Sequence, residues 1–332
     1  MDPLHAYWRE QLEARGAHPG RRHDAECLLS TGDQGMVDLS HQGVVAFRGP
    51  DAGEFLQGYL TCDMSDVAPD NPRLGALCNL QGRVVTNFVA VERDDAICLR
   101  MHRSLIERTF EAFGKYIPFS KSTMEDASER WIRIGLHEAA PLLMELLGFE
   151  KAPDPLWLIG EVAFAFELPD ASNRFELWIT REGRNLVDAL LERLPLMSPS
   201  QWDRLAIDAM SPEVTQRTSE KFLPQMLGLD KLGAVDFDKG CYLGQEIVAR
   251  VQYRGEHKRE LTILRADTLD QEPALGTNIC AGGKSVGEVV MSAKVATGRA
   301  PTDLLAVLQR GIAADVTLTL DGIPESVLQK PR

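Results

Sequence analysis

The sequence DKGCYLGQEIVAR, residues 238–250, is the most unusual stretch of this chain. Its composition predicts a helix from Leu243 onward, and Gly240 permits a sharp backbone bend just before Cys241. Cys241 would then lie beside a helix N-terminus, with Lys239 two residues away, and both features favour the thiolate over the thiol. A small buried cysteine at a turn is the alternative that spacing alone favours. We therefore treat Cys241, with Lys239, as a candidate reactive thiol; the pattern establishes no catalytic residue.

Upstream of this stretch, apolar runs and turn signals predict two successive groups of strands and helices, within residues 44–117 and 131–194. Gln81-Gly82 separates two apolar runs of the first group and predicts a hairpin. This order favours two α+β subdomains over one doubly wound parallel sheet. A further helix is expected at Trp202–Met210. The long polar stretch that follows, Ser211–Phe237, is expected to be a functional or disordered loop outside the core.

After Arg259 the sequence changes to short β-type runs separated by turn residues. These runs are Leu261–Arg265, Val286–Met291, Leu304–Leu308 and Val316–Leu320. Such a pattern predicts a small barrel or sandwich at the C-terminal end of the chain.

Length and charge narrow the class of protein. The chain has 332 residues, which allows roughly two domains with room for a third. Its 44% hydrophobic and 26% charged residues are ordinary for a packed protein. Lysine and arginine total 36 against 49 acidic residues, a net charge of −13. Because so acidic a surface repels phosphate backbones, we expect no direct binding of nucleic acid.

The cysteines and histidines do not form a metal-binding pattern. Six cysteines are far apart without a CxxC pair, and seven histidines are equally scattered. We therefore expect no metal site and no resident iron–sulfur cluster. No apolar run is long enough for a membrane helix, and the N-terminus has no hydrophobic signal core. These features predict a cytoplasmic protein with reduced thiols and no membrane partner.

Lys-Gly-Cys-Tyr-x-Gly-Gln-Glu resembles the signature of the YgfZ family, folate-binding proteins related to the glycine-cleavage T-protein, an aminomethyltransferase. The matching residues are Lys239, Gly240, Cys241, Tyr242, Gly244, Gln245 and Glu246. Residues 51–63, with Gln57, Gly58, Thr61 and Asp63, are similar to the family's N-terminal motif. Residues 115–121 and the Ser-Gln-Trp at 200–202 also match in order, whereas the residues before about 40 and the C-terminal segment match poorly.

The resemblance implies an α+β, T-protein-like fold. Two α+β subdomains in residues 1–255 and a small β-barrel in residues 256–332 would surround a central folate channel. It implies tetrahydrofolate, or a one-carbon derivative of it, as the cofactor, with Trp202 and Asp208 as folate-binding residues. Asp208 stands where the family usually has a glutamate, so its carboxylate reaches one methylene less far. Without the resemblance, Trp202 would be a core anchor and Asp208 a solvated helix residue.

Two departures from the family pattern bear on activity. The T-protein's catalytic acid lies after a hairpin turn, and the matching residues here, 82–87, contain no carboxylate. A tryptophan of the family before the first strand is replaced by Gln42. The first departure argues against aminomethyl transfer, and the second implies a partly rebuilt folate pocket.

These features lead to one main functional hypothesis and two rivals. The main one is a tetrahydrofolate-binding accessory protein that assists assembly or repair of iron–sulfur clusters in client proteins. Because the family's clients include radical enzymes that thiomethylate tRNA, an effect on tRNA modification would be indirect. The first rival is a folate-dependent aminomethyl or methyl transferase. The second is a scaffold with a vestigial pocket.

Overall fold

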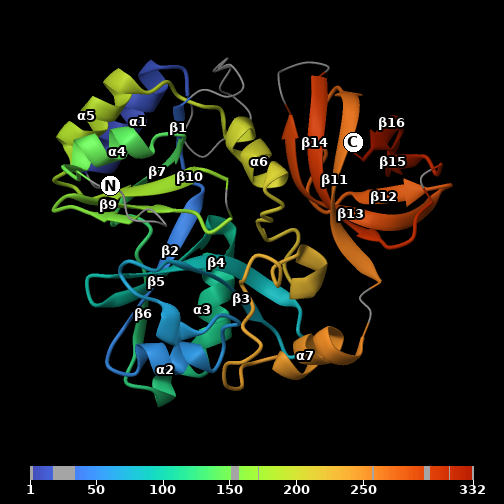
Figure 1. Cartoon of the computed structure of the whole chain (residues 1–332), viewed down its shortest axis with the longest axis horizontal. Helices are drawn as coiled ribbons and strands as arrows, with labels where there is room; N and C mark the ends of the chain where they lie inside the picture. The colour runs from blue at the N-terminus through green and yellow to red at the C-terminus, as the bar shows by residue number, and fades with distance from the viewer. Residues whose placement is uncertain are drawn as a thin grey trace.

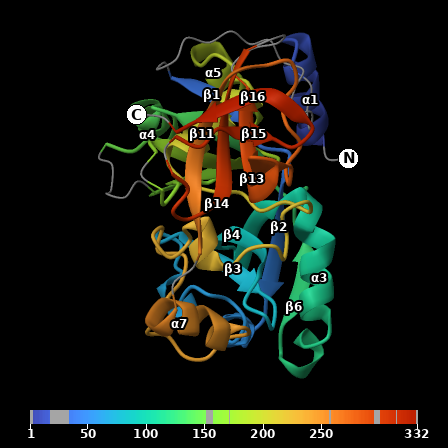
Figure 2. The same ribbon diagram turned by 90° about the vertical axis from the view of Figure 1, so that its right-hand side faces the viewer.

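A computed structural model describes residues 3–17, 34–150, 157–170, 172–255, 258–294, 300–313 and 315–330. The chain forms two antiparallel sheets and a closed barrel, with helix α6 (Pro199–Asp208) between the second sheet and the barrel (Figure 1). Seen from the side, the barrel and helix α7 (Gln245–Arg254) lie at opposite ends of one face (Figure 2). This arrangement confirms the predicted T-protein-like fold with two α+β parts and a C-terminal barrel.

The first sheet has the strand order β3-β4-β5-β2-β6. Its strands are β2 (Gln42–Arg48), β3 (Arg73–Cys78), β4 (Val84–Arg93), β5 (Ala96–His102) and β6 (Thr123–Asp126). The predicted hairpin joins β3 to β4. Gly82 has φ +70°, and the Asn79 side chain accepts hydrogen bonds from the amides of Gln81 and Arg83. Helices α2 (Ala52–Gln57) and α3 (Ile106–Gly114) pack on this sheet through Leu56 and Phe113.

The second sheet has the order β1-β7-β10-β9-β8 and carries three helices on one face (Figure 1). Its strands are β1 (Gly35–Asp38), β7 (Ile132–His137), β8 (Trp157–Ile159), β9 (Ala163–Glu167) and β10 (Arg174–Ile179). The helices are α1 (Pro3–Ala14), α4 (Ala140–Leu147) and α5 (Arg184–Arg193). Strand β1, which precedes the first sheet in sequence, pairs with β7 of the second. The two parts are therefore interleaved along the chain.

The barrel closes in the order β11-β14-β13-β12-β15-β16. Its strands are β11 (Arg259–Leu269), β12 (Asn278–Ala281), β13 (Lys284–Lys294), β14 (Ala300–Gln309), β15 (Leu318–Leu320) and β16 (Ile323–Gln329). Small and branched apolar side chains fill its interior, including Leu264, Val289 and Leu304. The predicted β-runs are thus strands of one closed barrel.

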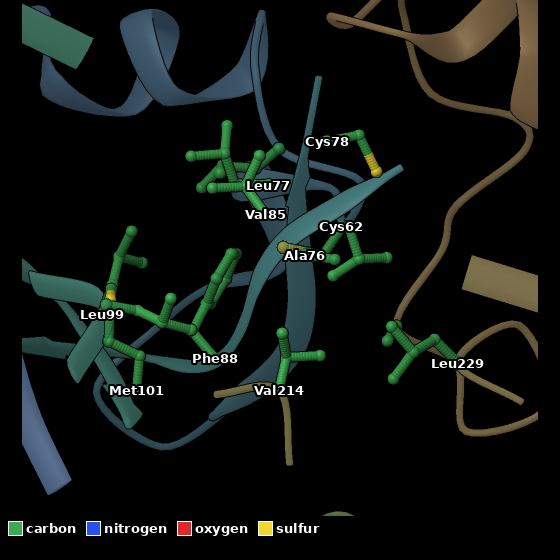
Figure 3. Close-up of a cluster of buried hydrophobic side chains, with 14 of the residues drawn as sticks. Cys62, Ala76, Leu77, Cys78, Val85, Phe88, Leu99, Met101, Val214 and Leu229 are labelled. Carbon is green, nitrogen blue, oxygen red and sulfur yellow. The ribbon is translucent and has the colours of Figure 1, made fainter. Parts of the chain in front are cut away.

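The stretch 211–237 differs from its sequence-based prediction. It is irregular, as expected, with a single 3-10 turn at Pro224–Leu227 among its described elements. It is nevertheless part of the core, because Val214, Phe222 and Leu229 are buried against the first sheet and the barrel. Figure 3 shows Val214 beside Phe88 of the first sheet. Polar side chains of this stretch, such as Ser219, hydrogen-bond to the main chain, and its apolar side chains pack between the first sheet and the barrel. The expectation of a loop outside the core was therefore wrong.

The two sheets pack face to face through aromatic side chains. Trp131, Phe164 and Trp178 lie between them, with ring centroids 5.0–6.3 Å apart. Arg100 of β5 forms a 2.5 Å ion pair with the buried Glu176 of β10. The interface is therefore largely apolar, and the Arg100–Glu176 ion pair joins one strand of each sheet. Among the described residues, no helix has the length and apolar character needed to cross a membrane.

Candidate functional site

A pocket lies where the two sheets, α6 and the barrel meet. Its walls come from β2, β4 and β5 of the first sheet, β10 of the second, α6, residues 211–213 and Met291 of β13. The enclosed space is small, about 60 Å³. Because every part of the fold contributes to its walls, this pocket is the natural candidate for the central ligand site.

Trp202 lines this pocket and is held on two sides. It lies in the first turn of α6, where Ser198 and Gln201 form a reciprocal capping box and Pro199 occupies the first turn. The ring packs on the backbone of β7, since a Cβ on Gly135 would lie 2.9 Å from Cη2 of Trp202. The guanidinium of Arg174 lies 4.7 Å from the ring centroid. A flat ligand can therefore stack on this ring only by replacing Arg174 or by using another part of the face.

Arg174 is itself held by buried partners. It forms an ion pair with Asp170, and its Nε donates to Ser172 Oγ at 2.8 Å. Both side chains of the Arg174–Asp170 pair are at most 4% exposed. The cover over Trp202 is thus fixed by a charge pair whose separation would leave a buried carboxylate without its partner.

The pocket is acidic. Four carboxylates line it, from Asp170, Glu176, Asp203 and Glu213, against two arginines, Arg100 and Arg174. Asp203 is buried at 6% exposure beside Trp202. Such a wall accepts hydrogen bonds from a ligand rich in N–H groups.

Asp208, the carboxylate proposed from the sequence, is exposed and does not line the pocket. At 3.6 residues per turn, Trp202, Asp203 and Ala206 share one side of α6, and Asp208 lies about 190° from the centre of that side. The helix phase was therefore the signal in the sequence that pointed to Asp203 instead.

Gln42, which stands in place of a tryptophan of the family pattern, lines this pocket, and so does Asn87 at the end of the segment 82–87 that contains no carboxylate. Gln42 donates through Nε2 to Glu213, while its Oε1 is buried without a partner among the described residues. Asn87 donates to the carbonyl of Pro212 and accepts from the amide of Val214, each at 2.8 Å. The amide of Asn87 is thus committed to the backbone. The pocket's acids come from other segments than residues 82–87.

The signature residues form a second feature, organised by Lys239. Its Nζ lies within hydrogen-bond distance of four oxygens: the carbonyls of Gln57 (3.0 Å), Leu60 (2.8 Å) and Cys62 (2.7 Å), and Oε1 of Gln57 (2.9 Å). An ammonium has three N–H donors, so these contacts use all of them. Burial lowers the pKa of Lys239, and the nearby Asp63 and Asp236 oppose this shift. Lys239 therefore anchors the loop to the C-terminal end of α2.

Tyr242 and Gly244 dock the loop on the β3–β4 hairpin. Tyr242 is buried, its ring lies 5.5 Å from Nζ of Lys239, and burial raises the pKa of its hydroxyl. Gly244 has φ +80°, and a Cβ there would lie 2.3 Å from the carbonyl oxygen of Asn79. Only glycine meets both conditions. The amide of Leu243 completes the docking by donating to the carbonyl of Gly58 at 3.1 Å.

The two best-matching motifs therefore form one structural unit, which sequence reasoning did not foresee. Gln57 accepts from Lys239 and from the amide of Met64, and donates to Asp63. Thr61 donates to the carbonyl of Ala234 at 2.6 Å, and its own carbonyl accepts from the amide of Asp236. Residues 57–63 and 234–244 thus satisfy each other's polar groups across some 180 residues of sequence.

Cys241 is the exposed member of this unit. The expected cause of its reactivity needs correction, because helix α7 begins at Gln245 with Gly244 as its N-cap. Cys241 lies three residues before that cap, and the ammonium of Lys239 is committed to the four oxygens described above. Gly240 needs no special conformation, since its φ is not positive and a Cβ there meets nothing within 4 Å. Gln245 is half-buried and Glu246 exposed at the start of α7.

The remaining described cysteines are less accessible. Cys62, Cys78 and Cys98 are buried, and burial raises the pKa of their thiols to about 11, 12 and 12. Cys280 is partly exposed on the barrel, and Cys27 lies outside the described residues. Within the part of the chain that the structure describes, no group of three or more His, Cys, Asp or Glu side chains could hold a metal ion.

Comparison with known proteins agrees with this geometry. The family description of the GCVT N-terminal domain matches residues 11–148. The crystal structure of glycine cleavage system aminomethyltransferase T from Bartonella henselae superposes with a TM-score of 0.73 at 17% identity, covering 97% of this chain and 95% of that one. The protein thus has the fold of the GCVT class.

Curated relatives narrow the class further. "tRNA-modifying protein YgfZ" of Colwellia psychrerythraea is 32% identical over 70% of this chain and 71% of its own length. The protein of that name from Yersinia enterocolitica is 30% identical over 88% and 90%, and the one from Serratia proteamaculans 31% over 79% and 81%. The chain belongs to the YgfZ family.

Replacing each of the two signature glycines by alanine tests how the loop docks on the β3–β4 hairpin. Gly244→Ala should lower the free energy of unfolding by at least about 2 kcal/mol, because it adds left-handed strain and an overlap with Asn79. Gly240→Ala is the matched control and should change it by less than about 0.5 kcal/mol. Urea denaturation followed by circular dichroism measures both values, and equal effects of the two changes would contradict this geometry.

Proposed function

We propose that the protein binds tetrahydrofolate and assists the assembly or repair of iron–sulfur clusters in client enzymes. Its effect on tRNA modification would be indirect, through those enzymes, and it would act in the cytoplasm without binding nucleic acid itself. The observation that carries the proposal is the acidic pocket at the junction of the three parts, with an indole on one wall. The membership in the YgfZ family supports the same conclusion.

The side chains of the pocket fit the pterin end of a folate. A pterin presents an amino group and a ring N–H on one edge, which a carboxylate accepts as a pair. Asp203 and Glu213 supply carboxylates, and the unpartnered Oε1 of Gln42 supplies another acceptor. When bound, the folate would supply one-carbon chemistry, while these residues would bind and orient its ring.

Seating the ring requires a local movement. The enclosed space of about 60 Å³ holds only part of a pterin, and Arg174 covers Trp202. Movement of the guanidinium off the indole would open the face for stacking and would leave the positive charge near the ligand. The glutamate tail of a folate is an anion that such a guanidinium can pair with.

The loop of Lys239 supports the role toward client proteins. It is anchored by buried contacts on both sides of Cys241, yet it leaves that thiol exposed. An exposed thiol on a firmly anchored loop is suited to contact a partner protein, whereas a thiol needed only for packing would be buried. We therefore assign Cys241 to the contact with clients.

A folate-dependent transferase remains the second candidate because of Glu213. Asn87 cannot act as an acid, but Glu213 places a carboxylate in the same pocket from a different segment. Turnover of tetrahydrofolate to its methylene form with an amine donor, lost in Glu213→Gln, would favour the transferase. Folate binding without turnover would favour the accessory role.

The pocket makes a specific prediction for folate affinity. Trp202→Ala should weaken binding of tetrahydrofolate by about tenfold or more, because the stacking face is lost. Asp203→Asn should weaken it by about tenfold through loss of a charged acceptor. Asp208→Asn, on the opposite side of α6, is the control and should change it by less than about twofold. Anaerobic calorimetry measures all three; absence of binding to the unaltered protein would refute the proposal.

The loop makes a second prediction, in a strain that lacks the gene. Cys241→Ser should leave folate affinity unchanged, because Cys241 does not line the pocket, yet fail to restore cluster-dependent enzymes under oxidative stress. Cys280→Ser, which removes a half-exposed thiol from the barrel, should restore them fully. The measurement is the activity of cluster enzymes and the fraction of thiomethylated tRNA. Full restoration by Cys241→Ser would remove the thiol from the proposed function.

A further inference from the structure

A second cavity, separate from the pocket of Trp202, lies beside helix α1. It is bounded by one side of α1, by the turn after β1, by Arg103 after β5, and by the residues that lead into β7. Its volume is about 210 Å³, whereas a single water needs only about 10–15 Å³. The cavity is therefore large enough for a small molecule.

The wall of this cavity contains a buried guanidinium that forms no ion pair within 4 Å among the described residues. Arg133 is 3% exposed and donates to the carbonyls of Gln42 (2.9 Å), Ser128 (2.8 Å) and Trp131 (3.1 Å). Among the described residues no carboxylate lies within 4 Å of it, and its Nε has no acceptor. Its direct acceptors are neutral carbonyls, and burial lowers the pKa of Arg133 to about 10, while the more distant carboxylates of Glu176, Asp38 and Glu129 oppose this shift.

The indole of Trp131 adds a second unused donor in the same wall. Its Nε1 is buried and has no hydrogen-bond partner among the described residues. The other indole of the cavity, that of Trp8, is satisfied, since it donates to Asp38 at 2.8 Å. Buried N–H groups are nearly always paired in native proteins, so two orphans beside one cavity require an explanation.

The carboxylates of the wall do not accept hydrogen bonds from these two N–H groups, because each carboxylate accepts from other donors. Asp38 accepts from Trp8, and from the hydroxyl and the amide of Ser40 at 2.5 and 3.3 Å. Glu129 accepts from Arg103 at 2.7 Å, and His5 lies 3.9 Å from its other oxygen. Arg9 adds a further, exposed cation on α1. The cavity wall thus has three arginines, Arg9, Arg103 and Arg133, against the carboxylates of Asp38 and Glu129, and two N–H groups that lack an acceptor within the described part of the chain.

We propose that this cavity binds a small oxyanion, a carboxylate or a phosphate, which accepts hydrogen bonds from Nε of Arg133 and Nε1 of Trp131. The anion would give both unpaired donors an acceptor, and its charge would be favoured by the guanidinium of Arg133 and the nearby Arg9 and Arg103. Because the two N–H groups are buried in the wall, binding includes a small adjustment of these side chains toward the anion. This site does not depend on folate binding, since it shares no lining residue with the pocket of Trp202.

The test is a calorimetric titration of the full chain with inorganic phosphate and, separately, with acetate. Saturable binding of either anion is expected, and the stronger of the two identifies the class. Trp131→Phe keeps an aromatic ring but removes the N–H, and should weaken binding by about tenfold or more. Trp157→Phe is the matched control: Trp157 lies in β8, outside the cavity, so the change should leave anion affinity within about twofold.

A second variant guards against a folding defect in the first. Arg9→Ala changes an exposed residue and should weaken anion binding severalfold, with less effect at high salt. No saturable binding of phosphate or acetate at millimolar concentrations would overturn the proposal. It would also be overturned if Trp131→Phe and Arg9→Ala both bound the anion as tightly as the unaltered protein.

Discussion

The buried ammonium of Lys239 is the interaction on which the arrangement of the signature loop depends. It binds three backbone carbonyls and one side-chain amide at the end of α2, all within 3.0 Å. A buried lysine is stabilising only when its donors are all used, so this contact fixes the relative position of residues 57–62 and 239 closely. Tyr242 and Gly244 then dock on the β3–β4 hairpin, and Cys241 is left exposed between two anchored points. Most residues of the signature thus have a structural role, because they hold the loop in place. The exposed thiol of Cys241 has no such role and needs a functional explanation.

The same hairpin connects this loop to the pocket. Gly82 at the hairpin turn lies against Ile247 of α7, and Asn87, five residues further along the chain, lines the pocket. In extended chain this separation is about 17 Å. The pocket and the loop that carries Cys241 therefore share one structural element, the β3–β4 hairpin.

Local patterns predicted local structure well. The Gln81-Gly82 turn, the two α+β groups and the barrel strands follow from apolar periodicity and turn residues, and Trp202 lines a pocket where the three parts meet. Long-range facts were not accessible. The pairing of β1 with β7 depends on contacts 100 residues apart, and the burial of Phe222 and Leu229 depends on surfaces from other parts. Asp203 and Glu213 line this pocket but were not singled out from the sequence, because motif matching pointed to Asp208; the helix phase of α6 sets Asp203 beside Trp202 and Asp208 on the other side.

The most direct test is whether Lys239 anchors the loop that carries Cys241. The measurement is the rate at which each cysteine reacts with iodoacetamide near neutral pH, determined by mass spectrometry in the unaltered protein and in Lys239→Met. In the unaltered protein Cys241 should react fastest, with Cys62 and Cys78 slower by about a hundredfold or more, since they are buried and their thiol pKa values are raised. In Lys239→Met the loop should detach, so Cys62 and Cys78 should lose much of their protection while Cys98, beyond the reach of the loop, keeps it. Labelling of Cys241 no faster than Cys78, or an identical pattern in both proteins, would contradict the account.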